Sequence, residues 1–153
     1  MPYRFQLTEH IAASPERVFE VMTDLSQAAG WMKGFVRIEH LTEGPMGVGT
    51  QWREVRRMMG REGAEVFQVT AYSPPTGWRL YVDGKLGASK RGYYDFTYTL
   101  SPSPTGTQLL LAAEMGDMGA VGTFLAKYLL SGMFKKAIAQ DHAALKAYIE
   151  RQG

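Results

Sequence analysis

The feature that most constrains the fold is the way glycine and proline divide the chain. Short segments of β character alternate with Gly/Pro turns as far as Gly119, and no proline follows. The remaining residues, 120–151, carry apolar side chains at spacings of three and four, which is typical of one long amphipathic helix. A curved antiparallel sheet with a single helix across it leaves a hollow, because the helix is narrower than the concave face. The functional question is therefore what fills that hollow.

The N-terminal segment predicts a strand followed by two short helices. Residues Tyr3–Ile11 alternate between apolar and polar side chains, as in a strand with one buried face. Ser14 can cap a helix, Pro15 suits its first turn, and Glu16 complements its dipole. A second short helical turn is expected to end at Gly30.

Six further strands follow the two short helices. Their expected ranges are 35–41, 50–59, 64–72, 78–83, 90–100 and 107–115. With the first strand they make a seven-stranded sheet, and the fold class is α+β. A length of 153 residues predicts one domain, 1–153.

Composition excludes several classes of protein. The chain has no cysteine, which rules out disulfides, thiolate metal sites and cysteine nucleophiles. It has no apolar leader and no run of about 18 apolar residues, so we expect a cytoplasmic protein without a transmembrane segment. A formal net charge of +2 is too small to indicate nucleic-acid binding, and the basic stretches 53–61 and 85–91 are interpreted as solvated sheet edges.

Several landmarks resemble a known family when their order and spacing are taken together. They are the segment 11–19 (Ile-Ala-Ala-Ser-Pro-Glu-Arg-Val-Phe), Asp24, Trp31, the segment 47–50 (Gly-Val-Gly-Thr), the segment 72–75 (Tyr-Ser-Pro-Pro) and the pair Gly106-Thr107. Over essentially the whole chain this pattern is similar to the START-like (SRPBCC) superfamily, which includes polyketide cyclase/dehydrase-like proteins. The resemblance implies the helix-grip fold, in which the sheet wraps around the C-terminal helix.

The resemblance does not imply one activity, because the superfamily holds carriers, receptors, cyclases and oxygenase subunits. The oxygenase subunits bind iron through two histidines and a carboxylate. Here His10, His40 and His142 fall on three different expected elements, so we expect neither a metal nor another cofactor.

The two strands 50–59 and 64–72 form a hairpin whose register the sequence leaves open. A two-residue turn at Gly60-Arg61 places Arg56 opposite Glu65, whereas a loop one residue longer turns Arg53 toward the other strand's apolar face. In either register one arginine shares the face of Phe67 and Val69, which we take as concave. It either forms a cross-strand pair with a glutamate or anchors a ligand carboxylate or ketone. We select Arg53 as the candidate anchor.

Bulky side chains of the strands and the helix are expected to form a cavity wall, although each could equally be ordinary core. The candidate ligand-binding residues are Trp31, Phe35, Trp52, Arg53, Phe67, Leu80, Tyr94, Phe96, Phe124 and Tyr128.

Three functions remain open. The first is a carrier or sensor that binds a hydrophobic or aromatic small molecule between the sheet and the C-terminal helix. The second is a polyketide cyclase/aromatase-like enzyme that uses the same cavity, although no nucleophile motif such as Gly-x-Ser-x-Gly is present and no catalytic residue is assigned. The third is a protein-partner or homodimerisation module that uses the helix surface Leu125–Met133, which is apolar almost all round.

Overall fold

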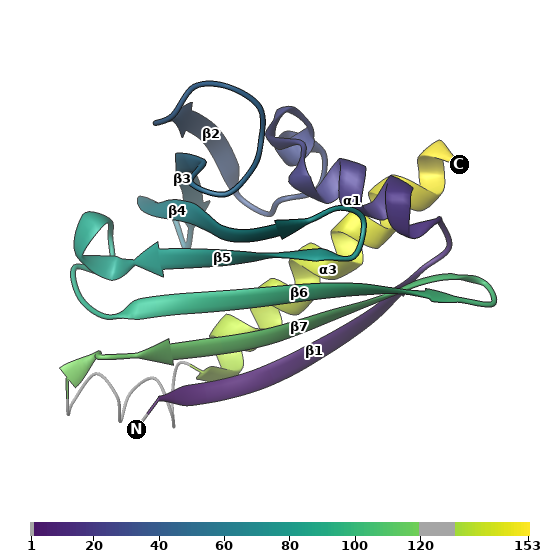
Figure 1. Ribbon diagram of the computed structural model, residues 1–153. Helices are drawn as coiled ribbons and strands as arrows, with labels where there is room; N and C mark the ends of the chain where they lie inside the picture. The colour runs from purple at the N-terminus through teal and green to yellow at the C-terminus, as the bar shows by residue number, and fades with distance from the viewer. Residues whose placement is uncertain (1, 120–130) are drawn as a thin grey trace.

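The computed structural model describes residues 2–119 and 131–153, whose elements are drawn in Figure 1. In chain order these elements are β1 (Tyr3–Ile11), α1 (Pro15–Thr23), the 3₁₀ helix η1 (Leu25–Gly30), β2 (Phe35–His40), β3 (Gln51–Met58), β4 (Arg61–Ser73), β5 (Gly77–Asp83), the 3₁₀ helix η2 (Gly84–Leu86), β6 (Tyr93–Ser103), β7 (Gly106–Gly116) and α3 (Ser131–Gln152).

All seven strands belong to one antiparallel sheet with the order β1-β7-β6-β5-β4-β3-β2. From β2 to β7 the strands follow one another as neighbours, and β1 joins the far edge by pairing with β7. The long helix α3 lies across the sheet, and α1 covers the end of the sheet where the C-terminus of the chain lies (Figure 1). The predicted α+β class, seven-stranded sheet, two short helices and C-terminal helix are confirmed; the first part of the expected helix, 120–130, lies outside the described residues.

The predicted capping interactions place the two short helices. The Ser14 side chain accepts a hydrogen bond from the Arg17 backbone N–H, and Pro15 occupies the first turn of α1. Asp24 ends α1 and at once caps η1 by accepting from the Ser26 backbone N–H. One residue therefore lies at the junction of the two helices, which close one end of the sheet.

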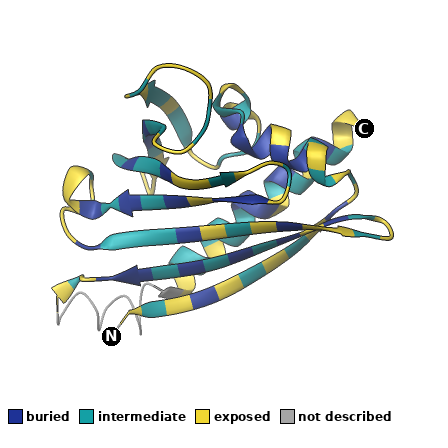
Figure 2. Ribbon diagram, in the orientation of Figure 1, coloured by how far each residue is buried: buried dark blue, intermediate teal, exposed yellow. Residues whose placement is uncertain are grey.

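The core lies between the sheet and the helices, where buried residues alternate along the strands with exposed ones (Figure 2). Leu145 and Ile149 of α3 are fully or almost fully buried, as are Leu109 and Leu111 of β7. These side chains belong to the same core cluster as Val18 and Phe19 of α1.

The β3–β4 hairpin differs from both predicted registers. Met58 pairs with Arg61, so the two-residue turn is Met59-Gly60, one position earlier than expected. Both turn residues have positive φ, 52° and 79°, as the favoured hairpin turn of this length requires. The sequence did not predict this turn, because methionine rarely adopts a positive φ. Both Met59-Gly60 and Gly60-Arg61 contain Gly60, so the glycine alone does not distinguish them.

The observed register decides which side chains face inward. Trp52 lies opposite Phe67 and Glu54 opposite Glu65, so Trp52, Glu54 and Arg56 share the concave face. Arg53 falls between them on the other face. A loop one residue longer would exchange the two sets.

The turn itself can be tested by replacing Met59, whose side chain is 90% exposed. Asparagine tolerates positive φ better than methionine, so Met59→Asn should raise the free energy of unfolding by about 0.5–1 kcal/mol. Urea unfolding followed by circular dichroism measures the change. Leu86→Asn, at another exposed apolar position, is the control and should give no gain; a Met59→Asn protein no more stable than this control contradicts the turn assignment.

Candidate ligand-binding cavity

A cavity of about 570 Å³ lies between the concave face of the sheet and α3. Aromatic and aliphatic side chains form most of its wall. They are Met22, Leu25, Trp31, Met32, Trp52, Met58, Phe67, Trp78, Leu80, Val82, Ala88, Tyr94, Phe96, Tyr98, Phe134, Ala137 and Ile138. The polar lining residues are Glu54, Arg56, Arg61, Glu62, Glu65, Asp141 and His142, with Gly63 between them. Because Met58, Arg61 and Glu62 are exposed, the cavity reaches the surface at the β3–β4 hairpin.

The aromatic part of the wall is ordered by strand pairing. Trp52 and Phe67 are direct cross-strand neighbours, and their rings stack at 5.5 Å with an angle of 2° between planes. Trp78 of β5 continues the stack at 6.1 Å from Trp52. Across the cavity, Phe134 of α3 stacks on Tyr94 at 5.1 Å. The result is two flat aromatic surfaces, one on β3–β5 and one where β6 meets the helix.

The structure brings together six of the ten candidate residues. Those that line the cavity are Trp31, Trp52, Phe67, Leu80, Tyr94 and Phe96. Phe35 is half-buried on the edge strand β2, opposite Arg56 in the register, and is not a lining residue. Phe124 and Tyr128 lie outside the described residues.

Arg53 does not reach the cavity. It lies on the opposite face of β3, where its Nη1 donates to Glu39 Oε1 at 3.0 Å and its side chain is 39% exposed. The selection of Arg53 therefore differs from the structure. The reason is that the hairpin has a two-residue loop, whereas Arg53 would face inward only with a loop one residue longer. Arg56, three positions along the chain, is the arginine that faces inward.

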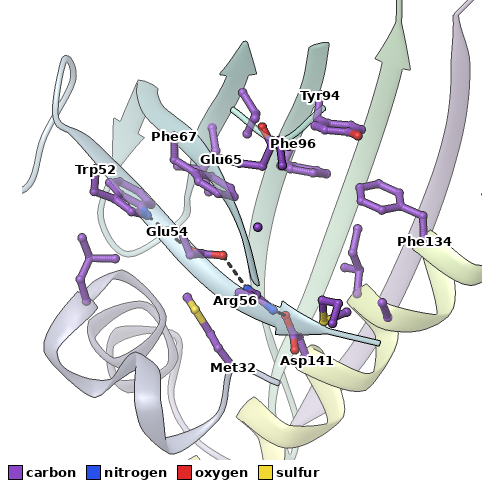
Figure 3. Close-up of a pocket in the computed structure, with 18 of the residues that line it drawn as sticks. Met32, Trp52, Glu54, Arg56, Glu65, Phe67, Tyr94, Phe96, Phe134 and Asp141 are labelled. Atoms are coloured by element: carbon purple, nitrogen blue, oxygen red, sulfur yellow. Dashed lines mark hydrogen bonds and ion pairs between the residues drawn. The ribbon is translucent and has the colours of Figure 1, made fainter. Parts of the chain in front are cut away.

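Arg56 lies between two carboxylates, one on its own strand and one on α3 (Figure 3). Its Nε donates to Glu54 Oε2 at 2.8 Å, and its Nη1 donates to Asp141 Oδ2 at 2.5 Å. Glu54 is 5% exposed and Asp141 8%. Asp141 also accepts a hydrogen bond from the Lys33 backbone N–H at 3.0 Å. This Glu54–Arg56–Asp141 cluster joins the sheet, the helix and the segment before β2.

Next to this cluster, buried His142 of α3 and half-buried Tyr98 of β6 form a hydrogen bond of 3.0 Å between Nε2 and the hydroxyl. Burial lowers the pKa of His142 to about 4, although the nearby Asp141 carboxylate opposes the shift. Burial also raises the pKa of the Tyr98 hydroxyl. Both side chains are therefore neutral at pH 7, and each can donate or accept one hydrogen bond.

A second polar group lies across the hairpin from Glu54. Glu65 Oε1 accepts from the Ser89 backbone N–H at 2.9 Å and from the Ser89 hydroxyl at 2.6 Å, and that hydroxyl lies 3.1 Å from the Tyr94 hydroxyl. Burial raises the pKa of Glu65. Glu65 Oε2 is buried and has no hydrogen-bond partner among the described residues, like Nε1 of Trp31 and of Trp78. These three polar atoms carry the desolvation cost of buried groups without a hydrogen bond among the described residues.

None of these polar lining residues was among the candidate ligand-binding residues predicted from the sequence. Glu54 and Arg56 were visible as alternate residues on one strand, and the inward position of Trp52 was the signal that would have selected them. Asp141 and His142 gave no such signal, because a polar pair on an amphipathic helix ordinarily faces solvent. Within residues 2–119 and 131–153, no three His, Asp or Glu side chains are placed to hold a metal ion.

Comparison with protein families shows to which family the chain belongs. The polyketide cyclase/dehydrase and lipid transport family matches residues 2–150. The chain belongs to this family. The START-like resemblance found in the sequence is thereby confirmed, and with it a hydrophobic cavity of the kind that the family uses for ligands. No curated protein matches the sequence.

Solved structures share the fold at low sequence identity. Zhui aromatase/cyclase from Streptomyces sp. R1128 is 18% identical with a TM-score of 0.80, covering 99% of this chain and 96% of that one. The protein TTHA0849 from Thermus thermophilus is 18% identical with a TM-score of 0.79, and Ara h 8.0201 is 15% identical with a TM-score of 0.78; each comparison covers 99% of both chains. At these identities the likeness concerns the fold alone. No helix in the described part of the chain is long and apolar enough to cross a membrane.

The neutral, buried state of His142 predicts a pH dependence of stability. His142 has a pKa of about 6.5 in the unfolded chain and about 4 in the folded protein. Between these pH values the unfolded state therefore binds more protons than the folded state. This group should therefore lower the free energy of unfolding by about 2 kcal/mol as the pH falls from 7 to 5. Urea unfolding at both pH values should show a smaller loss for His142→Gln than for the unmodified protein.

His40→Gln is the matched control, because His40 is exposed. It should retain the full pH-dependent loss. Equal losses in the His142→Gln and unmodified proteins would show that His142 is not held neutral by burial.

Proposed function

We propose that this protein binds an apolar or aromatic small molecule in the cavity between the sheet and α3. The observation that carries the proposal is a 570 Å³ space with two aromatic surfaces, open at the β3–β4 hairpin. Ligand sites for small molecules commonly have volumes of about 300–1,000 Å³ and mostly apolar walls with a few polar groups. Burial of apolar ligand area contributes about 25 cal/mol per Å² to binding.

Membership of a polyketide cyclase/dehydrase and lipid transport family supports the same function, since both activities named in the family description require an oily molecule to be enclosed. The polar atoms at the wall then orient the ligand rather than supply most of the affinity. In this function the protein is a carrier or a sensor, and the bound molecule leaves unchanged.

Filling the cavity should abolish binding. Ala137 lines the cavity from α3, and Ala137→Phe places a ring inside it; the fluorescent probe N-phenylnaphthylamine should then bind at least tenfold more weakly. Ala143 is exposed on the same helix, so Ala143→Phe is a control of equal size and should leave the affinity unchanged. Native mass spectrometry of the purified protein tests for a natural ligand that is lost in the same variant. Equal probe binding by the two variants would place the bound probe outside this cavity.

A second candidate function is a cyclase-like enzyme, favoured by the polar groups that meet at one side of the cavity. Arg56 can polarise a ligand carbonyl, and the Tyr98–His142 pair holds an exchangeable proton beside it. The structural neighbour Zhui is named an aromatase/cyclase, and its 18% identity carries no residue role to this chain. Intramolecular aldol condensation of a linear diketone to a cyclic enone, with loss of water, is the simplest reaction of this type.

The enzyme is tested by following enone absorbance with a small linear diketone as substrate. Arg56→Lys should lower the rate by about 10²–10³-fold, because a positioned donor to the developing oxyanion is lost. Arg53→Lys is the matched control on the outer face and should leave the rate unchanged. A rate no faster than that of heat-denatured protein, with the probe still bound, favours the carrier or sensor.

The third function open from the sequence, a partner or dimer surface over Leu125–Met133, falls mostly outside the described residues. Met133 lies within them and is 56% exposed. The partner or dimer surface stays a prediction. Light scattering of the purified protein measures the oligomeric state and so tests for a dimer.

A further inference from the structure

We propose that the cavity selects neutral ligands over anionic ones, because its interior arginine is already neutralised by two carboxylates. This inference rests on the proposed binding function and concerns the ligand class. It contrasts with the ordinary expectation that an arginine in an apolar pocket binds a ligand carboxylate.

Inside the cavity, acidic side chains outnumber arginine and lysine side chains. Arg56 is the one arginine or lysine among the described lining residues that is not exposed, whereas three acidic lining residues are not exposed, namely Glu54, Asp141 and Glu65. Glu54 and Asp141 hold its guanidinium at 2.8 and 2.5 Å. An anion entering the cavity would lose its water without gaining an unpaired cation, and would lie close to two or three carboxyl groups.

Arg56 nevertheless retains hydrogen-bonding capacity. Its Nε and Nη1 donate to the two carboxylates, and Nη1 also approaches the Lys33 carbonyl at 3.5 Å, whereas Nη2 has no partner among residues 2–119 and 131–153. The guanidinium therefore offers a donor without offering net positive charge. A neutral acceptor, such as a ketone or an ether oxygen, suits such a group.

This free donor defines the ligand class. The ligand that fits is an aromatic or alicyclic molecule carrying a carbonyl or ether oxygen and no ionised acid. Fatty acids and other carboxylates are disfavoured.

The mouth of the cavity does not reverse this preference. Arg61 and Glu62 line it as an exposed pair of opposite charge. Exposed charges are screened by water and salt, so they act weakly on a ligand held among the buried side chains.

The test compares two fluorescent probes with the same aromatic body: neutral N-phenylnaphthylamine and its sulfonated analogue, anilinonaphthalene sulfonate. At pH 7 the neutral probe should bind at least tenfold more tightly to the unmodified protein. Asp141→Asn frees one side of Arg56, and should improve binding of the sulfonate at least fivefold while changing that of the neutral probe less than twofold. Glu54→Gln provides an independent second variant with the same expected result, should Asp141→Asn fail to fold as judged by circular dichroism.

Glu39→Gln is the matched control, because Glu39 holds Arg53 on the outer face of the sheet. It removes a carboxylate from an arginine in the same strand and should leave both affinities unchanged. Equal binding of the two probes, or a sulfonate affinity that does not respond to Asp141→Asn or Glu54→Gln, overturns the charge selectivity while leaving the binding function in place. Failure of both probes to bind overturns the binding function and the selectivity with it.

Discussion

A buried ion pair between β3 and α3 is the interaction on which the rest of the structure depends. Arg56 and Asp141 join the two elements that enclose the cavity, and Glu54 completes the neutralisation of the guanidinium. Such a cluster adds little net stability, because the desolvation of its members offsets their attraction. Removing Arg56 is costly, about 3–5 kcal/mol, since it leaves two carboxylates inside the protein without their cation. The cluster thus sets where the helix lies over the sheet more than how stable the fold is.

The same cluster divides the cavity into two chemical environments. The stacked rings of Trp52, Phe67 and Trp78 offer flat apolar area without charge. The polar side of the wall is the cluster itself together with neutral His142 and Tyr98. A ligand with an apolar body and neutral polar groups at one side would match both the aromatic and the polar part of the wall. A carrier and a cyclase would each need this arrangement, and they differ in whether the polar side only orients the molecule or also moves a proton.

Much of the fold could be predicted because its signals are local. Ser14 and Asp24 cap helices through their own neighbours in the chain, and the Gly/Pro turns bound strands that alternate visibly. The aromatic wall was also within reach, since bulky residues on strands under a helix face the concave side. The inward arginine was not, because it depended on whether the β3–β4 loop has two residues or one more. Asp141 and His142 were out of reach for a different reason, namely that their burial is created by Arg56 and Tyr98 on distant strands.

The sequence by itself determined the family, the order of the elements and the presence of a hollow under the C-terminal helix, because periodicity and capping act over a few residues. Only the tertiary structure decided the chemistry of that hollow. A two-residue turn at Met59-Gly60, rather than a loop one residue longer, places Arg56 inward and Arg53 outward. Side chains on a strand alternate with a period of two, so a one-residue choice in a hairpin is enough to exchange a surface charge for a buried one.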